Sequence, residues 1–145
     1  MIRATDTTAD LSEIVEAFEL VMPLFGKDNQ IGVTGRTGVK DPIGDAIGWI
    51  PDGVEEADYS DVSEPLLGTV FERLLYELPF AYGRTRLMRM RPKSCLSMHA
   101  DPTRRYHFAL VTNPGCYIVE VTEENVVFHH VPAQTDGTGA VGRRK

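Results

Sequence analysis

The segment from His99 to His107 holds residues whose types and spacing could do chemistry. His99 and Asp101 stand two positions apart, so in a β-strand their side chains point to the same face. An imidazole and a carboxylate on one face are two-thirds of the 2-His-1-carboxylate triad that holds non-haem Fe(II). Arg105 and His107 repeat this spacing, and a guanidinium suits bidentate binding of a small carboxylate. The segment therefore predicts a site for a metal and an organic acid, with no evident third metal ligand.

The other two histidines, His129 and His130, are the candidates for that third ligand. Neighbouring strand residues point to opposite faces, so only one of the two can face the site. The alternative, which we favour, is a pair of ordinary edge-strand residues, one facing inward and one outward. Arg105 and His107 could likewise be solvated, but Ala109 and Val111 share their parity, which favours a row facing a cavity.

Short strands must position these residues, because the second half of the chain alternates apolar runs with turn residues. Pro102 cannot continue a strand ladder. Asn113–Cys116 has Pro and Gly at the two central positions, which is typical of a type II turn. The predicted strands cover residues 84–91, 95–101, 105–112, 117–122 and 126–131.

The first half is predicted to hold two helices. Asp10 stands at an N-cap position with Glu13 three residues later, and apolar residues then recur at helical spacing as far as Pro23. A second helix is predicted over 64–78, with a buried stripe of Leu67, Val70, Phe71, Leu74 and Leu75. Between them, residues 28–61 predict loops with one or two short strands, and Trp49 is expected to pack over the core.

Helices followed by an antiparallel run of short strands predict a mainly β, α+β fold of the sandwich or jelly-roll type. With 145 residues, 42% of them hydrophobic, the chain suits one domain over 1–133, and the polar residues 134–145 are expected to be a disordered tail. The net charge of −6 argues against nucleic-acid and anionic-membrane partners, although four arginines lie between residues 84 and 91. Two cysteines without CxxC spacing, no long apolar run and no signal peptide predict a cytoplasmic protein.

The stretch GRTRLMRMRPKSCLSMHADPTRRYHFALVTNPGCYIVEV resembles the aspartyl/asparaginyl β-hydroxylase branch of the Fe(II)- and 2-oxoglutarate-dependent dioxygenases. The shared features are an Arg- and Leu-containing strand, a turn with proline, and a histidine two residues before a carboxylate. An Arg-x-His strand that runs into the TNPGC turn follows them. The resemblance covers residues 84–133, and the first 60 residues add only a helix and a Gly/Asp-rich loop.

This resemblance implies a double-stranded β-helix (a cupin-like jelly roll) with helices on one sheet and a metal between its two sheets. His99 and Asp101 would be iron ligands, and Arg105 and His107 would help to hold 2-oxoglutarate. The reaction would couple decarboxylation of 2-oxoglutarate to hydroxylation of an amino-acid or peptide side chain. In that family a distal histidine and a cosubstrate arginine follow the equivalent of residue 133. Here QTDGTGAVGRRK follows, so the chain is expected to lack the last strands of the barrel.

Two functions therefore stay open. One is a hydroxylase that is active only if the third ligand comes from elsewhere, acting on a small-molecule or peptide substrate. The other is a non-catalytic dioxygenase-like domain that acts in binding or assembly. Open strand edges after residues 126–131 invite pairing with another chain, so we expect a homodimer, or strand exchange that involves residues 31–33.

Overall fold

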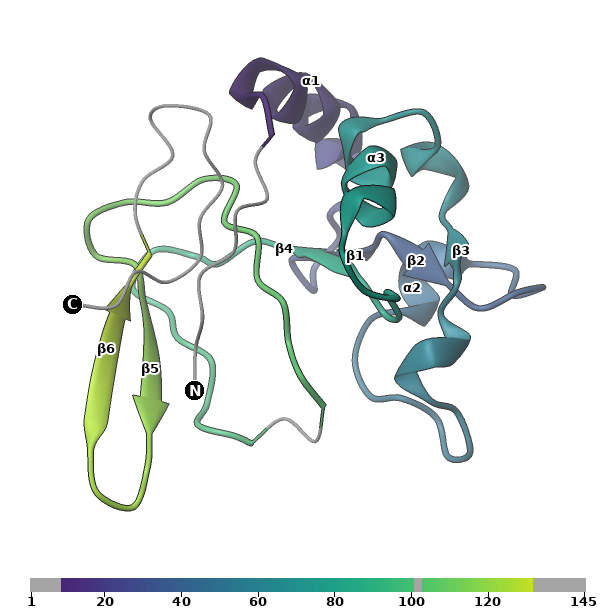
Figure 1. Ribbon diagram of the computed structural model, residues 1–145. Coiled ribbons are helices and arrows are strands. Elements are labelled where there is room, and N and C mark those ends of the chain that lie inside the picture. Colours follow the sequence, from purple (N-terminus) through teal and green to yellow (C-terminus); the bar gives the residue numbers. More distant parts are fainter. Residues whose placement is uncertain (1–8, 101–102, 132–145) are drawn as a thin grey trace. The chain divides into compact units, whose positions relative to one another are not determined.

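The computed structural model describes residues 9–100 and 103–131, which fall into two compact units (Figure 1). Residues 15–98 form one of them, here called the helical unit. Residues 9–14 and 99–131 are the described part of the other, here called the hairpin unit. The predicted tail, 134–145, lies outside the described residues, and the single domain over 1–133 stays a prediction.

Helix α1 (Leu11–Val21) begins where the sequence predicts its cap. One carboxylate oxygen of Asp10 accepts hydrogen bonds from the backbone N–H groups of Ser12, at 2.8 Å, and Glu13, at 3.3 Å. These bonds satisfy donors that the first helical turn leaves without partners. Pro23 lies in the 3₁₀ turn η1 (Met22–Leu24), which ends the helix. The buried side of α1 consists of Ile14, Ala17 and Val21.

Two small antiparallel sheets form the centre of the helical unit. Strand β1 (Gln30–Gly32) pairs with β4 (Arg86–Met88), and β2 (Thr34–Gly35) pairs with β3 (Asp61–Val62). The buried Val33 links the two sheets, because its N–H donates to Thr85 O at 2.8 Å and its C=O accepts from Ser63 N at 2.9 Å. The predicted strand over 84–91 is thus reduced to its central residues.

The short helix α2 (Pro42–Asp45) lies against β1 and β2, and two glycines allow this close approach. A Cβ on Gly32 would lie 2.8 Å from the Ala46 Cβ, and one on Gly35 would lie 2.5 Å from the Pro42 Cβ. These distances are shorter than van der Waals contact, so the packing requires glycine at both positions.

The second predicted helix is divided. Residues Glu64–Leu66 form a 3₁₀ turn, η3, and α3 covers only Val70–Glu77. Gly68, with a φ of +73°, separates them, and the Thr69 hydroxyl caps α3 by accepting from Phe71 N at 3.2 Å. The predicted buried stripe is correct for Val70, Phe71 and Leu75. It is wrong for Leu67, which is 53% exposed in the break.

Trp49 does not pack over the core, contrary to the prediction, because 97% of its surface is exposed. It lies in the loop between α2 and the 3₁₀ turn η2 (Glu56–Asp58), beside Gly48 at a φ of +77°. An Arg84 N–H donates to Gly48 O at 3.1 Å and so fixes this loop.

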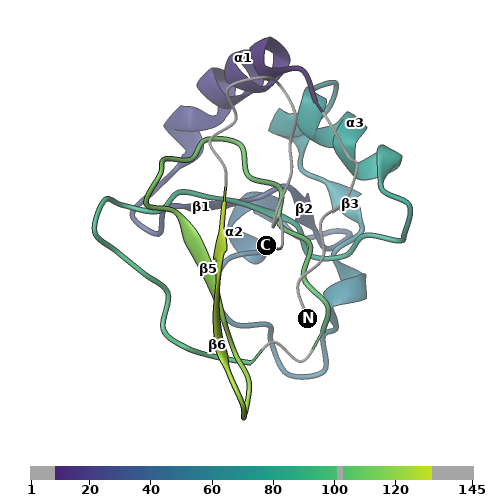
Figure 2. The same ribbon diagram turned by 60° about the vertical axis from the view of Figure 1, so that its left-hand side comes forward.

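The predicted hairpin is present in the hairpin unit (Figure 2). Strands β5 (Tyr117–Val121) and β6 (Val126–His130) are antiparallel, with Val119 opposite Phe128. Before them, Cys116 N donates to Asn113 O at 3.0 Å and closes the predicted turn. The type II assignment is wrong, because Gly115 lacks the positive φ that this turn requires. Instead, the Asn113 side-chain oxygen accepts from Gly115 N at 2.8 Å.

The described residues of two other predicted strands, 95–101 and 105–112, contain no regular strand. A strand needs a neighbour for its backbone N–H and C=O groups, and period-two patterning does not provide one. Residues 92–100 are all exposed, so water can satisfy these groups. Across the described ranges, the chain forms three α-helices and two-stranded antiparallel sheets, and the jelly roll stays a prediction.

Gly35→Ala should destabilise the helical unit, because its methyl group would overlap the Pro42 ring. Overpacking of this kind costs roughly 1–3 kcal/mol, measurable as a lower midpoint of urea unfolding. Gly26→Ala is the matched control, since no atom lies within 4 Å of the added Cβ. Equal midpoints for the two variants would contradict the packing described for α2.

Candidate functional site

Of the two predicted iron ligands, only His99 lies within the described residues. His99 is exposed and outside regular secondary structure. Asp101 lies outside the described residues. The strand that was to direct both side chains to one face is therefore not formed at His99.

The two predicted cosubstrate residues follow in the same unit. Arg105 is half-buried and His107 is exposed, and neither lies in a strand. The predicted cavity-facing row does not form, because Val111, which shares their parity, is 76% exposed. The sequence spacing of Arg105 and His107 thus has no counterpart in a regular strand.

His129 is the buried member of the histidine pair. Only 5% of its surface is exposed, and its Nε2 lies 2.9 Å from a carboxylate oxygen of Glu120 on the neighbouring strand. The contact joins β6 to β5 on the face that also carries Ile118. A carboxylate partner of this kind fixes the orientation of an imidazole and leaves its other ring nitrogen for a further contact.

His130 is exposed, on the opposite face of the hairpin. Its ring lies edge-on to Tyr117, with centroids 5.3 Å apart. The prediction of one inward and one outward histidine is therefore confirmed.

The described residues do not assemble an iron site. Among residues 9–100 and 103–131, no three His, Cys, Asp or Glu side chains lie close enough together to hold a metal ion. The donor types of His99 and Asp101 suit Fe(II), but the described residues do not assemble the triad that this ion needs. No reaction step through iron follows from this arrangement.

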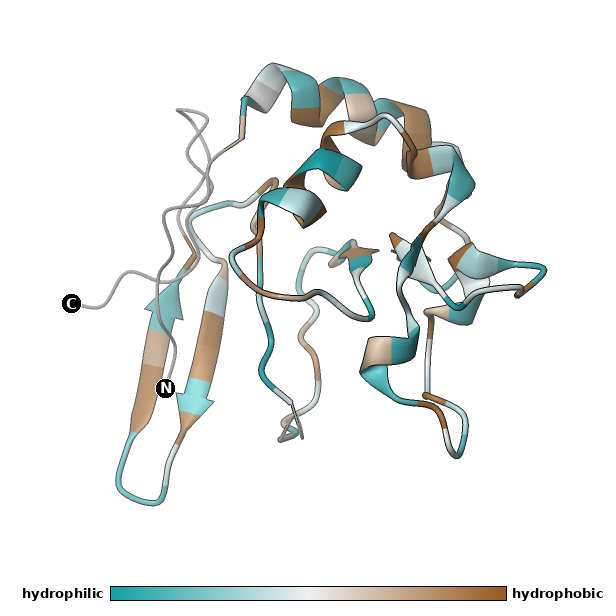
Figure 3. Cartoon of the chain, turned by 45° about the vertical axis from the view of Figure 1, so that its right-hand side comes forward, coloured by the Kyte–Doolittle hydropathy of each residue, from teal (hydrophilic) through white to brown (hydrophobic). Residues whose placement is uncertain are grey.

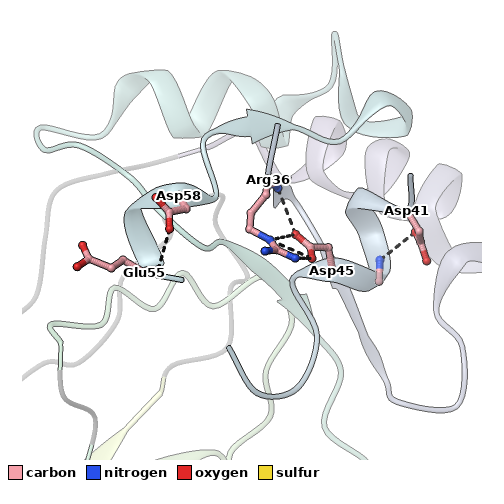
Figure 4. Close-up of polar contacts among 6 residues, drawn as sticks. Arg36, Asp41, Asp45, Glu55 and Asp58 are labelled. Carbon is pink, nitrogen blue, oxygen red and sulfur yellow. Dashed lines mark hydrogen bonds and ion pairs between the residues drawn. The ribbon is translucent and has the colours of Figure 1, made fainter. Parts of the chain in front are cut away.

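A second cluster of polar side chains, which the sequence reasoning missed, lies in the helical unit (Figure 4). The guanidinium of Arg36 faces the carboxylate of Asp45, with Nε 2.9 Å from Oδ2 and Nη2 2.5 Å from Oδ1. The Arg36 backbone N–H also donates to Oδ2, at 3.3 Å. Only 7% of the Asp45 side chain is exposed, so these bonds replace most of its hydration.

The ring of Tyr59 lies beside this pair. Tyr59 is fully buried, and the guanidinium carbons of Arg36 and Arg84 lie 5.7 and 5.8 Å from its centroid. Arg84 is itself 6% exposed in its side chain and pairs with Glu56 at 3.4 Å. Each guanidinium therefore has a carboxylate partner, and the charges of the cluster balance. This favours a structural role over anion binding.

The hydrogen bonds from Arg36 lower the pKa of Asp45 from its ordinary value of 3.8, although burial opposes them. Nothing in the sequence marks this pair, because a separation of nine residues corresponds to no helix or strand period. The only signal was the Gly- and Asp-rich composition of residues 28–61, which indicates loops but not their contacts.

No protein-family model matches this chain, and a search of the curated proteins finds no relative. Within the described residues, no helix is both long enough and apolar enough to cross a membrane.

Asp45→Asn should lower the melting temperature at neutral pH by roughly 3–8 °C, because an amide cannot replace the paired carboxylate. The ion pair stabilises the fold fully above the ordinary pKa of 3.8, and this stabilisation is lost as the pH falls through the lowered pKa of the folded state. The difference between wild type and variant should therefore shrink in acid. Thermal melts from pH 7 to pH 2 measure it.

Asp52→Asn is the control for this experiment, because Asp52 is exposed. It should change neither the melting temperature nor its dependence on pH. A difference for Asp45→Asn that stays constant down to pH 2 would contradict the role given to the ionised carboxylate.

Proposed function

We propose that this chain is an Fe(II)- and 2-oxoglutarate-dependent dioxygenase that hydroxylates an amino-acid or peptide side chain. One observation carries the proposal: His99-x-Asp101 and Arg105-x-His107 stand in one short segment, and the Asn113 turn and the β5–β6 hairpin follow in the predicted order. The boundaries of that hairpin agree with the strand pattern that accompanies the resemblance.

Each residue has a defined part in this proposal. His99 and Asp101 offer a nitrogen and a carboxylate oxygen to the metal. Arg105 pairs with a carboxylate of 2-oxoglutarate, and His107 donates a hydrogen bond to it. Iron, if bound by these residues, would supply the oxidising chemistry of the hydroxylation. The two free cysteines support a reducing, cytoplasmic location.

Anaerobic titration with Fe(II) and 2-oxoglutarate tests this function. A competent site gives a metal-to-ligand charge-transfer band in the visible spectrum. His99→Ala should weaken Fe(II) binding at least roughly tenfold, because an imidazole ligand is lost. Arg105→Ala should instead raise the 2-oxoglutarate concentration that half-saturates the band.

Thr103→Ala is the matched control, because this exposed residue lies between the two pairs and has no role in the proposal. It should titrate as the wild type does. The absence of the band at millimolar 2-oxoglutarate would overturn the enzymatic proposal.

A second candidate function, assembly with another copy of the chain, is supported by one face of the hairpin. Figure 3 colours much of both strands as hydrophobic. Tyr117, Val119 and Val121 are about half-exposed and lie opposite His130, Phe128 and Val126, of which Phe128 is 65% exposed. The face, here called the hairpin face, carries no carboxylate, ammonium or guanidinium group. A two-stranded sheet of this kind is marginal alone and gains stability when its apolar face is covered.

A second copy is the occupant that the sequence favours. The net charge of −6 makes two copies repel each other, and contact through a face without charge adds no close like-charge contacts to this repulsion. Two hairpins packed face to face would form a small sandwich with the usual spacing of about 10 Å between sheets.

Phe128→Asp should convert the dimer into a monomer, since it places a carboxylate in the middle of the hairpin face. Sedimentation at micromolar concentration measures the change in mass. Leu67→Asp is the control, because it adds the same charge at a comparably exposed apolar side chain of the helical unit. A wild-type chain that sediments as a monomer would refute this candidate function.

A further inference from the structure

A pocket of about 220 Å³ lies in the helical unit, at the end of the β1–β4 ladder. Three sulfur-containing residues line it: Met88, Met90 and Cys95. Cys95 is exposed and forms no disulfide. The pocket shares no residue with the segment from His99 to His107.

The strand places the two methionines together. Met88 is the last residue of β4, opposite Gln30 in β1. The next residue, Arg89, continues the ladder, with its N–H donating to Asn29 O at 2.8 Å. Met90 therefore lies two residues along an extended chain from Met88, and both line the same pocket. They are 42% and 49% exposed, which is unusual for large apolar side chains at the end of a strand.

A tight turn brings the cysteine to the same pocket. Ser94 N donates to Arg91 O at 3.2 Å, and the Ser94 hydroxyl donates to the same oxygen at 2.6 Å. Lys93 has a φ of +59°, a left-handed conformation that reverses the chain direction. Cys95 follows directly and lines the same pocket as the two methionines.

Two thioethers and one thiolate are soft ligands, which select Cu(I) over the harder ions Mg²⁺, Ca²⁺ and Mn²⁺. Methionine side chains have three rotatable bonds, so both sulfurs can turn toward one ion without a change in the backbone. The nearby charges are those of Asp28, Arg89 and Arg91, which also line the pocket. The guanidinium of Arg89 has partners of its own, because it donates to the Asn29 side chain at 2.9 Å and lies 5.3 Å from the Phe25 ring centroid.

We propose that Met88, Met90 and Cys95 form a binding site for one Cu(I) ion, with three sulfur ligands. The Cys95 thiol loses one proton to solvent as its sulfur binds the ion, and copper keeps its oxidation state. The site goes beyond the proposed hydroxylase function and depends on none of its residues.

Anaerobic titration of the full chain with Cu(I), in competition with the chelator bicinchoninate, tests the site. One equivalent should bind, with one proton released. Cys95→Ser and the double variant Met88→Leu/Met90→Leu should each raise the dissociation constant for Cu(I) at least roughly tenfold. Leucine keeps the apolar volume of methionine, so circular dichroism should show an unchanged fold.

Two control variants separate this site from sulfur in general. Cys116→Ser removes the other thiol and Met98→Leu removes a thioether that is 79% exposed, and neither should change Cu(I) affinity. Loss of binding in Cys95→Ser without loss in the double methionine variant would overturn the three-sulfur site. Equal loss in Cys116→Ser would overturn it as well. The Fe(II) titration is independent, so failure of either proposal can be distinguished from failure of the other.

Discussion

The helical unit depends on buried ion pairs, because its strands are too short to hold one another. Each of its sheets has two strands of two or three residues, which is below what an independent sheet needs. Arg36 with Asp45, and Arg84 with the more distant Glu56, join loops around the buried Tyr59 ring. Breaking either pair would leave a charge without its partner in a poorly hydrated site, which is costly.

The shortness of the strands also determines where binding surfaces can form. Loops fixed by ion pairs and glycine contacts leave strand ends open, and Met88, Met90 and Cys95 line a pocket at one such end. In the hairpin unit, β5 and β6 bury His129 against Glu120 on one face and expose apolar side chains on the other. Two of the proposed features, the sulfur-containing pocket and the hairpin face, therefore lie at the end or on the face of a small sheet.

Local signals predicted the elements that local interactions form. The Asp10 cap, the apolar period of α1 and the β5–β6 hairpin all depend on residues close in sequence. The prediction of one helix over 64–78 is wrong, because Gly68 takes a positive φ and Thr69 caps a helix that begins only at Val70. The predicted strands over 95–101 and 105–112 are absent from the described residues, because alternation of apolar and polar residues cannot supply a pairing neighbour. The position of Trp49 was predicted wrongly, because its loop is fixed by a contact between Arg84 and Gly48 that the sequence does not reveal. The Arg36–Asp45 pair could not be predicted, since it depends on the tertiary fold.

The central claim is that the segment from His99 to His107 binds a metal together with 2-oxoglutarate. Manganese(II) is a hard paramagnetic ion that accepts imidazole and carboxylate ligands but not thioethers. We therefore expect Mn(II), added with 2-oxoglutarate, to broaden the amide NMR signals of His99, Arg105 and His107 first. Broadening spread over the acidic surface, with no preference for this segment and no dependence on 2-oxoglutarate, would contradict the claim.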